Sequence, residues 1–341
     1  MAEGHYQLVL NASSVLARRL LQAAVLFWLV VTLVFALVRL APGDPAAFLV
    51  PPTATAADAV RLRSELGLDR PVAVQYARWV RALVRGDLGE SFATRRPVAA
   101  MLREAAPVSA WLGLVSITLT FLLGVPVGML QAARRGLFTD RALTLLTTTA
   151  YAAPTFWIAL LLVAVFTYGA AALGLPPWLR LPAFGIRTPG QELHGAAAAL
   201  DVLRHAVLPV FSLSAVGAAG IARYARSGVA DILAEEYVRA ARAKGLPRAR
   251  LFGRHVLSNL APLLVVLFAL SLPGIVAGSV FVESVFAWPG LGRATLNAIL
   301  ARDFPVVMGA SVFYAAVTIL ANLIADLMLP VLDPRRTART R

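Results

Sequence analysis

The sequence predicts an all-α integral membrane protein with six transmembrane helices. Of the 341 residues, 59% are hydrophobic and only 15% are charged, and the mean hydropathy is +0.74. Several apolar segments are long enough to cross a bilayer, whose core of about 30 Å needs about 20 helical residues. Basic residues gather in alternate connecting segments. Together these observations exclude a water-soluble protein.

Six segments contain no Asp, Glu, Lys or Arg, and each is expected to contribute one span because a helix satisfies its own backbone polar groups in lipid. They are Leu20–Val38, Ala105–Ala133, Ala142–Leu179, His205–Ala222, His255–Val282 and Phe304–Ala325. The third exceeds one crossing, so its tail "GLPPW" is expected to leave the bilayer as a loop. The fourth is short and contains Pro209. Its small residues suit a helix packed inside a bundle, and a substrate path is the alternative.

The first span could be mistaken for a signal peptide because Arg18 and Arg19 precede it. Its apolar region is too long for a signal peptide, and Arg39 follows directly. We therefore expect an anchor that is not cleaved.

The placement of basic residues predicts which segments face the cytoplasm. If the N-terminus is cytoplasmic, more than half of the 32 Lys and Arg lie in inside segments, as the positive-inside rule requires. The expected plan begins with a cytoplasmic N-terminus (1–19), a first span (20–40) and an extracytoplasmic cap segment (41–107). A five-helix core (108–330) follows, which contains a cytoplasmic loop (227–255), and the chain ends in a cytoplasmic tail (331–341).

The cap segment is predicted to contain two helices. In "VQYARWVRALV" the apolar side chains recur at helical spacing opposite Arg78, Arg81 and Arg85, which indicates an amphipathic helix on the outer membrane surface. "ADAVRLRSEL" resembles a shorter one. They could form a structural cap over the bundle or contact a delivering protein.

Composition and motifs argue against nucleic-acid binding and catalysis. The net charge of +14 follows mostly from topology, since no basic stripe is interleaved with stacking aromatics. The chain has no Cys, and its histidines form no metal motif: they are His5, His194, His205 and His255. Glu283 and Asp326 are expected at span ends, where they can reach water or Arg partners.

The loop "EEYVRAARAKGLPRARLFGRHVLSNLAP" is the most informative stretch. Strong helix formers from Asp231 to Lys244 predict one helix, with Gly245 as its C′ residue and Pro247 at the first position of a second helix. Tyr237, Ala240, Ala241 and Lys244 would share a flat face suited to close contact with another protein. A basic loop under anionic lipid head groups is the alternative.

This loop resembles the coupling loop of ABC-importer permeases, whose pattern is Glu-Ala-Ala, three residues, Gly, and later an apolar position. Arg239, Ala240, Ala241 and Gly245 fall on it. Arg239 stands where the general pattern has Glu, and His255 stands at the later apolar position. Both departures resemble the dipeptide/oligopeptide/nickel permeases of the first-subunit type. Further stretches agree in order along the chain: "RLAPGDP", "GDLGESF", "VFAWPGLGR", "DFPVVMG" and "LDPR".

The resemblance implies a type I ABC-importer permease fold and a non-catalytic transport subunit. Such a subunit is expected to bind no cofactor or metal. The chain accordingly has no G-x-x-x-x-G-K-[ST] phosphate loop. The implied partners are a second homologous permease, one or two cytosolic ATPase subunits, an extracytoplasmic substrate-binding protein and membrane lipid. The implied ATPase contacts are Glu235, Glu236, Tyr237, Arg239, Ala240, Ala241, Lys244 and Gly245.

The resemblance favours peptides as substrates, with nickel chelates, glutathione or oligosaccharides as alternatives within the family. It implies a multi-pass protein of the bacterial cytoplasmic membrane. An ion-driven secondary transporter is the alternative from another class, but neither acids in mid-membrane nor inverted repeats are evident in the sequence.

Overall fold

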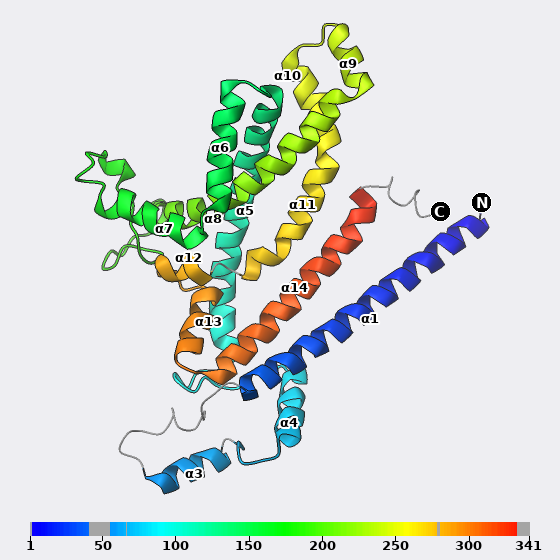
Figure 1. Cartoon of the computed structure of the whole chain (residues 1–341). Coiled ribbons are helices and arrows are strands. Elements are labelled where there is room, and N and C mark those ends of the chain that lie inside the picture. The colour runs from blue at the N-terminus through cyan, green and yellow to red at the C-terminus, as the bar shows by residue number, and fades with distance from the viewer. Residues whose placement is uncertain (1, 41–54, 66, 278–279, 333–341) are drawn as a thin grey trace. The chain divides into compact units, whose positions relative to one another are not determined.

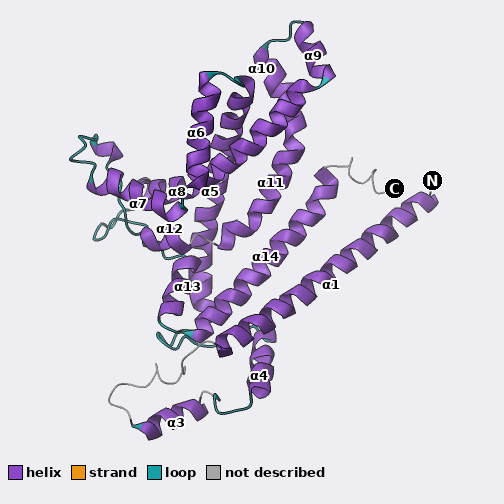
Figure 2. Ribbon diagram, viewed as in Figure 1, coloured by secondary structure: helices purple, strands orange, loops and turns teal. Residues whose placement is uncertain are grey.

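The computed structural model describes residues 2–40, 55–65, 67–277 and 280–332, and every named element in these ranges is helical (Figures 1 and 2). The chain divides into two compact units. The first comprises Met1–Pro107 and Arg293–Leu323, and the second Val108–Gly292 and Ile324–Arg341. We describe each unit by itself.

The first unit contains four complete or nearly complete helices and parts of two longer ones. They are α1 (Ala2–Leu40), α3 (Ala56–Glu65), α4 (Val72–Val84), most of α13 (Leu291–Leu300), the start of α5 (Val98–Ala133) and most of α14 (Phe304–Leu332). The two helices predicted in the cap segment are therefore present as α3 and α4.

Helix α4 packs on α1 through its aromatic face. The Phe35 ring lies 5.2 Å from that of Tyr76 and 5.6 Å from that of Trp79. The Thr32 hydroxyl lies 2.7 Å from the Tyr76 hydroxyl, within hydrogen-bond distance. The arginines of α4 are exposed on the other face. The aromatic face of α4 thus packs against α1 and its basic face is accessible.

A buried carboxylate ties the "GDLGESF" stretch to the start of α14. Asp303, 3% exposed, accepts hydrogen bonds from the Ser91 hydroxyl at 2.5 Å and from the backbone N–H groups of Phe92 and Ala93 at 3.0 and 3.2 Å. A Cβ added at Gly309 would approach Val98 Cγ1 to 2.6 Å. The stretches "GDLGESF" and "DFPVVMG" are thus hydrogen-bonded to each other.

The second unit is built around the long helix α8 (Gly195–Ala234), which packs against most of the other helices of this unit. The unit contains most of α5, α6 (Phe138–Ala152), α7 (Thr155–Val163), α9 (Glu236–Ala243), α10 (Arg248–Arg250), α11 (Leu257–Ala277) and α12 (Val280–Val285). Short π and 3-10 helices are η1 (Ala164–Tyr168), η2 (Pro177–Leu179) and η3 (Leu251–Val256).

Glycines let α5 and α8 approach closely. A Cβ added at Gly124 would lie 2.7 Å from the Ala218 carbonyl oxygen, and one at Gly128 would collide with the Ala222 carbonyl oxygen. The two glycines are four residues apart, the spacing of the small-residue motif that packs membrane helices. Ala218, Ala222 and Ala225 of α8 are buried, which agrees with the predicted packing of its small residues inside a bundle.

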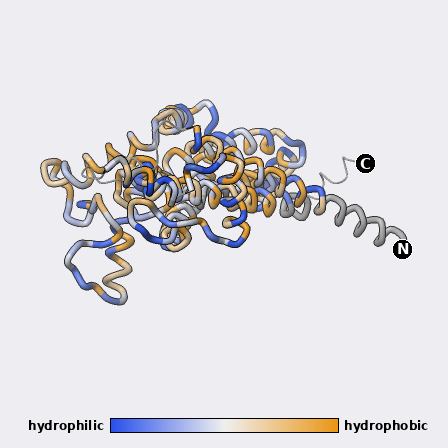
Figure 3. The backbone as a smooth tube through the Cα atoms, turned by 90° about the horizontal axis from the view of Figure 1, so that it is seen from below, coloured by the Kyte–Doolittle hydropathy of each residue, from blue (hydrophilic) through white to orange (hydrophobic). Residues whose placement is uncertain are grey.

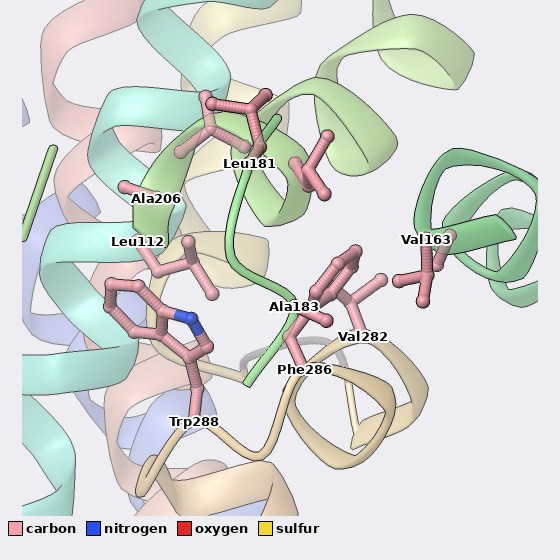
Figure 4. Packing of buried hydrophobic residues seen from close by; sticks show 11 residues of the cluster. Leu112, Val163, Leu181, Ala183, Ala206, Val282, Phe286 and Trp288 are labelled. Carbon is pink, nitrogen blue, oxygen red and sulfur yellow. The ribbon is translucent and has the colours of Figure 1, made fainter. Parts of the chain in front are cut away.

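The stretch "VFAWPGLGR" closes the core of this unit. Phe286 and Trp288 are 0% and 1% exposed, and they pack with Leu112, Leu181 and Val282 (Figure 4). The Trp288 ring stacks on Trp111 with centroids 5.9 Å apart.

For Glu283 the predicted access to water is wrong. It is 0% exposed rather than at a wet span end. Its carboxylate accepts a hydrogen bond from the Ser109 hydroxyl at 2.7 Å, and Ser109 Oγ accepts one from the Leu291 N–H at 2.8 Å. Gly290 and Gly292 of the following loop bring its backbone against this carboxylate. Asp326 is exposed, as expected.

The predicted third span, Ala142–Leu179, is not one straight helix. Helices α6 and α7 are bent by 103° at a short break. Pro154 lacks an N–H and disfavours helical geometry in the residue before it, and Ala153 is accordingly extended at φ −74° and ψ 133°.

The predicted fourth span was too short. Pro209 is buried inside α8 and does not end it, and α8 runs for 40 residues. A buried proline is tolerated in a membrane helix where neighbouring groups satisfy the freed backbone.

Five helices of the described residues are long and apolar enough to cross a membrane, or six if the bent pair counts as one span. Figure 3 shows hydrophobic residues along the helical coils and hydrophilic runs in connecting segments. Parts of three expectations lie outside the described residues: most of "RLAPGDP", most of "LDPR" and the tail at 333–341.

Candidate coupling interface

The loop after α8 begins with a break that the sequence did not predict. Helix α8 ends at Ala234, and Glu235 is extended at φ −66° and ψ 145°. Helix α9 then starts at Glu236. The single helix expected from Asp231 to Lys244 is therefore wrong, because an extended residue in its first third turns the chain and frees α9 to take its own direction (Figure 1).

The end of α9 is a Schellman turn. The Gly245 N–H donates to the Arg242 carbonyl at 2.9 Å, and the Leu246 N–H donates to the Ala241 carbonyl at 3.2 Å, the two hydrogen bonds that define the motif. Gly245 has φ +75°, which a residue without a Cβ adopts at no steric cost. The predicted C′ glycine is confirmed.

The second helix begins one residue later than predicted. Pro247 is the residue before α10 rather than its first residue. From Arg248 the chain continues through α10, the π-helical segment η3 and α11, and Arg248–Leu272 qualifies as one candidate span. The predicted arrangement of a helix, a sharp turn and a helix entering the fifth span is thus present.

One residue seats α9 on the rest of the unit. Val238 is 0% exposed, and α9 packs against α8 and η3. Leu251 and Val256 of η3 are also buried, at 2% and 0%. An eight-residue helix with a single buried anchor has little stability of its own and is held by its neighbours.

The predicted contact residues lie outside this anchor. Tyr237 is 44% exposed. Ala241 is half-buried, and the others are exposed: Glu235, Glu236, Arg239, Ala240, Lys244 and Gly245. The predicted face of Tyr237, Ala240, Ala241 and Lys244 therefore exists as an accessible surface, and two of its four side chains are methyl groups.

An ion pair fixes the helix that carries this loop. Arg226 of α8 binds Asp140 through two hydrogen bonds, from Nε at 3.1 Å and Nη2 at 3.0 Å. Asp140 is nearly buried and also accepts the Gly136 N–H at 3.0 Å. The α5–α6 turn is thereby tied to the last third of α8. Sequence reasoning missed this pair, because only the fold brings residues 86 positions apart together.

The described residues contain no group of three or more His, Cys, Asp or Glu placed to hold a metal ion. The chemistry available at the loop is that of a protein contact surface: small side chains, a tyrosine and exposed charges of both signs.

Comparison with known proteins identifies the family of the chain. Residues 124–338 match the family described as "Binding-protein-dependent transport system inner membrane component", and residues 13–113 match its N-terminal family. The oligopeptide transport system permease protein AppB of Bacillus subtilis (strain 168) is 34% identical over 95% of this chain and 99% of its own length.

Two further relatives bear other substrate names. The probable D,D-dipeptide transport system permease protein DdpB of Escherichia coli (strain K12) is 36% identical over 90% of this chain and 92% of its own. The glutathione transport system permease protein GsiC of Salmonella paratyphi A (strain ATCC 9150 / SARB42) is 33% identical over 93% and 96%. A solved structure of the MetNI methionine ABC transporter aligns with a TM-score of 0.48 and 17% identity, over 68% of this chain and 96% of that one.

These matches define a transport permease, a multi-pass membrane protein rather than a soluble module. The chain belongs to the family of binding-protein-dependent transport system inner membrane components, and it is a permease subunit of an ABC importer. The resemblance and the all-α membrane permease fold that the sequence predicted are confirmed.

Proposed function

We propose that this chain forms half of a translocation pathway for peptides, and that α9 transmits the work of a cytosolic ATPase to it. The observation that carries the proposal is the accessible face of α9, which lies on the residues that match the coupling pattern. Peptides are favoured because several relatives at 31–36% identity are named as peptide permeases.

The partners follow from the same proposal. A second homologous permease completes the pathway, one or two ATPase subunits bind the coupling loops, and an extracytoplasmic binding protein delivers the substrate. The chain itself is non-catalytic. ATP-driven closure of the ATPases would move the coupling helices as rigid bodies and switch the pathway between two states.

The test is Ala241→Glu. If this face seats in an ATPase groove, a large charged side chain enters a tight contact at a cost of roughly 1–3 kcal/mol or more. We expect the chain to insert and pair normally, but recovery of the ATPase with it in affinity purification should fall by about tenfold, and peptide uptake with it.

Ala243→Glu is the matched control, because Ala243 is exposed two residues further on, away from this face. It should leave both measurements close to those of the unsubstituted chain. Normal ATPase recovery with Ala241→Glu would contradict the coupling role of α9.

The proposed topology places both termini and the loop at 227–255 in the cytoplasm and the segment at 41–107 outside, in a bacterial cytoplasmic membrane. The chain has no Cys, so single cysteines report location directly. Ser64→Cys and Arg248→Cys, both exposed positions, should react with an impermeant thiol reagent from opposite sides. Reaction of both from one side would refute this topology.

A further inference from the structure

An arginine lies well inside the length of α8 and is stacked on a tyrosine. The Arg223 guanidinium carbon is 4.7 Å from the centroid of the Tyr151 ring, a cation–π distance. A Cβ added at Gly220 would lie 3.5 Å from the same ring. The ring therefore rests on α8 between Gly220 and Arg223.

Both residues are far from the ends of their helices that adjoin the coupling loop and the α5–α6 turn. Arg223 precedes the end of α8 by 11 residues and Tyr151 follows the start of α6 by 13, which is about 17 and about 20 Å at 1.5 Å per residue. The guanidinium thus lies well inside α8 and not at the end that leads into the coupling loop.

Both side chains are accessible, and the charge of Arg223 is not paired with a carboxylate of the described residues. Tyr151 is 52% exposed and Tyr224 57%, and Arg223 is exposed. Within the described part of the chain no carboxylate lies within ion-pair distance of Arg223. Its neighbour Arg226, by contrast, is paired with Asp140.

The accessible side of α8 here is polar. Gly220, Arg223, Tyr224 and Ser227 lie on one face of the helix, and each is half-buried or exposed. By contrast, 61% of the most apolar 18-residue stretch of α8 is buried, whereas the value is 11% to 33% for the other candidate spans. A charged side chain facing lipid at this depth is costly, so such residues face a water-filled cavity or a partner. The most enclosed helix of the unit thus keeps one polar face open.

The helix break lies beside the pair. Tyr151 is followed three residues later by Pro154, and α7 begins at Thr155. The first turn of a helix carries N–H groups without intrahelical acceptors and a partial positive charge.

We propose that Arg223 and Tyr151 form a substrate contact in the translocation pathway, where the guanidinium binds a carboxylate of the passing peptide. This inference rests on the proposed peptide transport and deepens it. The Tyr151 ring holds the guanidinium against α8, and the peptide carboxylate forms the ion pair with Arg223. The polar face of Tyr224 and Ser227 provides the water-filled wall along which the substrate moves.

The first experiment tests the site without any substrate, in membrane vesicles containing the assembled importer. Ser227→Cys lies one turn from Arg223, and we expect it to react with small charged methanethiosulfonates. The anionic sulfonatoethyl reagent should be favoured over the cationic trimethylammonioethyl reagent, and adding Arg223→Gln should lower that ratio about threefold. Leu145→Cys, on an exposed apolar position of α6, should not react.

Absence of reaction at Ser227→Cys, or a ratio that Arg223→Gln leaves unchanged, would overturn the pathway assignment. Either result would leave the proposed transport function standing, because labelling requires no transport.

The second experiment measures ATP-dependent uptake of tri-alanine by the same importer. Arg223→Gln should reduce uptake about tenfold at unchanged recovery of the complex, and Arg223→Lys should restore part of it. Arg135→Gln, which removes an exposed charge from the α5–α6 turn, is the control and should transport normally. Normal uptake with Arg223→Gln would refute the substrate contact, whereas failure of the unsubstituted importer to transport any peptide would refute the proposed function instead.

Discussion

The loop that follows α12 and the loop between α8 and α11 both carry recognisable sequence stretches, yet they place their side chains in opposite ways. In "VFAWPGLGR" Phe286, Trp288 and Leu291 are 0–1% exposed. In the coupling loop Tyr237 is 44% exposed and Val238 is the one fully buried side chain of α9. A recognisable stretch therefore does not reveal by itself whether it binds a partner or completes a core; burial separates the two.

The physical cause of the difference lies in what each loop covers. The loop after α12 lies over the Glu283 carboxylate, and its two glycines bring the backbone against that acid. A buried carboxylate must be hydrogen-bonded to be tolerated, and Ser109 helps to meet this requirement. The coupling loop instead packs through Val238 and leaves its polar side chains exposed.

Gly290→Ala should have the largest effect, because it disrupts the buried loop. A Cβ at Gly290 would lie 2.5 Å from both Glu283 Oε2 and Ser109 Oγ, and relieving that collision moves a hydrogen-bonded buried acid. We expect destabilisation of roughly 1–3 kcal/mol or more, seen as a severalfold lower yield of monodisperse chain after detergent extraction.

Pro289→Ala is the matched control, since Pro289 is exposed in the same loop. Its yield should stay close to that of the unsubstituted chain. If Gly290→Ala also gave a normal yield, the loop would not have the tight packing that distinguishes it from the coupling loop.

The sequence predicted one of these loops better than the other. The structure of the coupling loop depends on residues close together in the sequence: helix formers, a C′ glycine and a proline. The succession of helix, turn and helix was therefore predicted. The break at Glu235 was missed because Glu favours helix and no local residue pattern marks the turn there.

The buried loop depends on contacts between distant residues. Ser109 and Glu283 are 174 positions apart, and no local pattern indicates that they meet. The same holds for Ser91 with Asp303 and for Arg226 with Asp140. The spans themselves were predicted from hydropathy, but the bend before Pro154 was not, because proline can also continue a helix, as Pro209 does inside α8.

Gly245→Val should have an intermediate effect, on function rather than on yield. A β-branched residue resists the left-handed conformation at φ +75°, so the Schellman turn would rearrange and redirect α9 relative to α10. No atom lies within 4 Å of a Cβ at this position, so the core is untouched and the chain should insert normally. We expect peptide uptake to fall severalfold.

Gly245→Asn sharpens this test, because Asn tolerates the left-handed region better than other residues with a side chain. Its uptake should lie close to that of the unsubstituted chain. Equal loss with Val and Asn would show that the side chain itself, and not the turn geometry, matters at this position.

Arg250→Gln should have the smallest effect. Arg250 is exposed at the end of α10, outside the face formed by Tyr237, Ala240, Ala241 and Lys244. Solvent screens its charge, and an exposed ionic contact contributes at most about 1 kcal/mol. We expect uptake within about twofold of the unsubstituted chain and unchanged ATPase recovery. A loss as large as that of Ala241→Glu would extend the contact surface from α9 across the turn to α10, and the exposed loop would then act as one continuous interface instead of a single helical face.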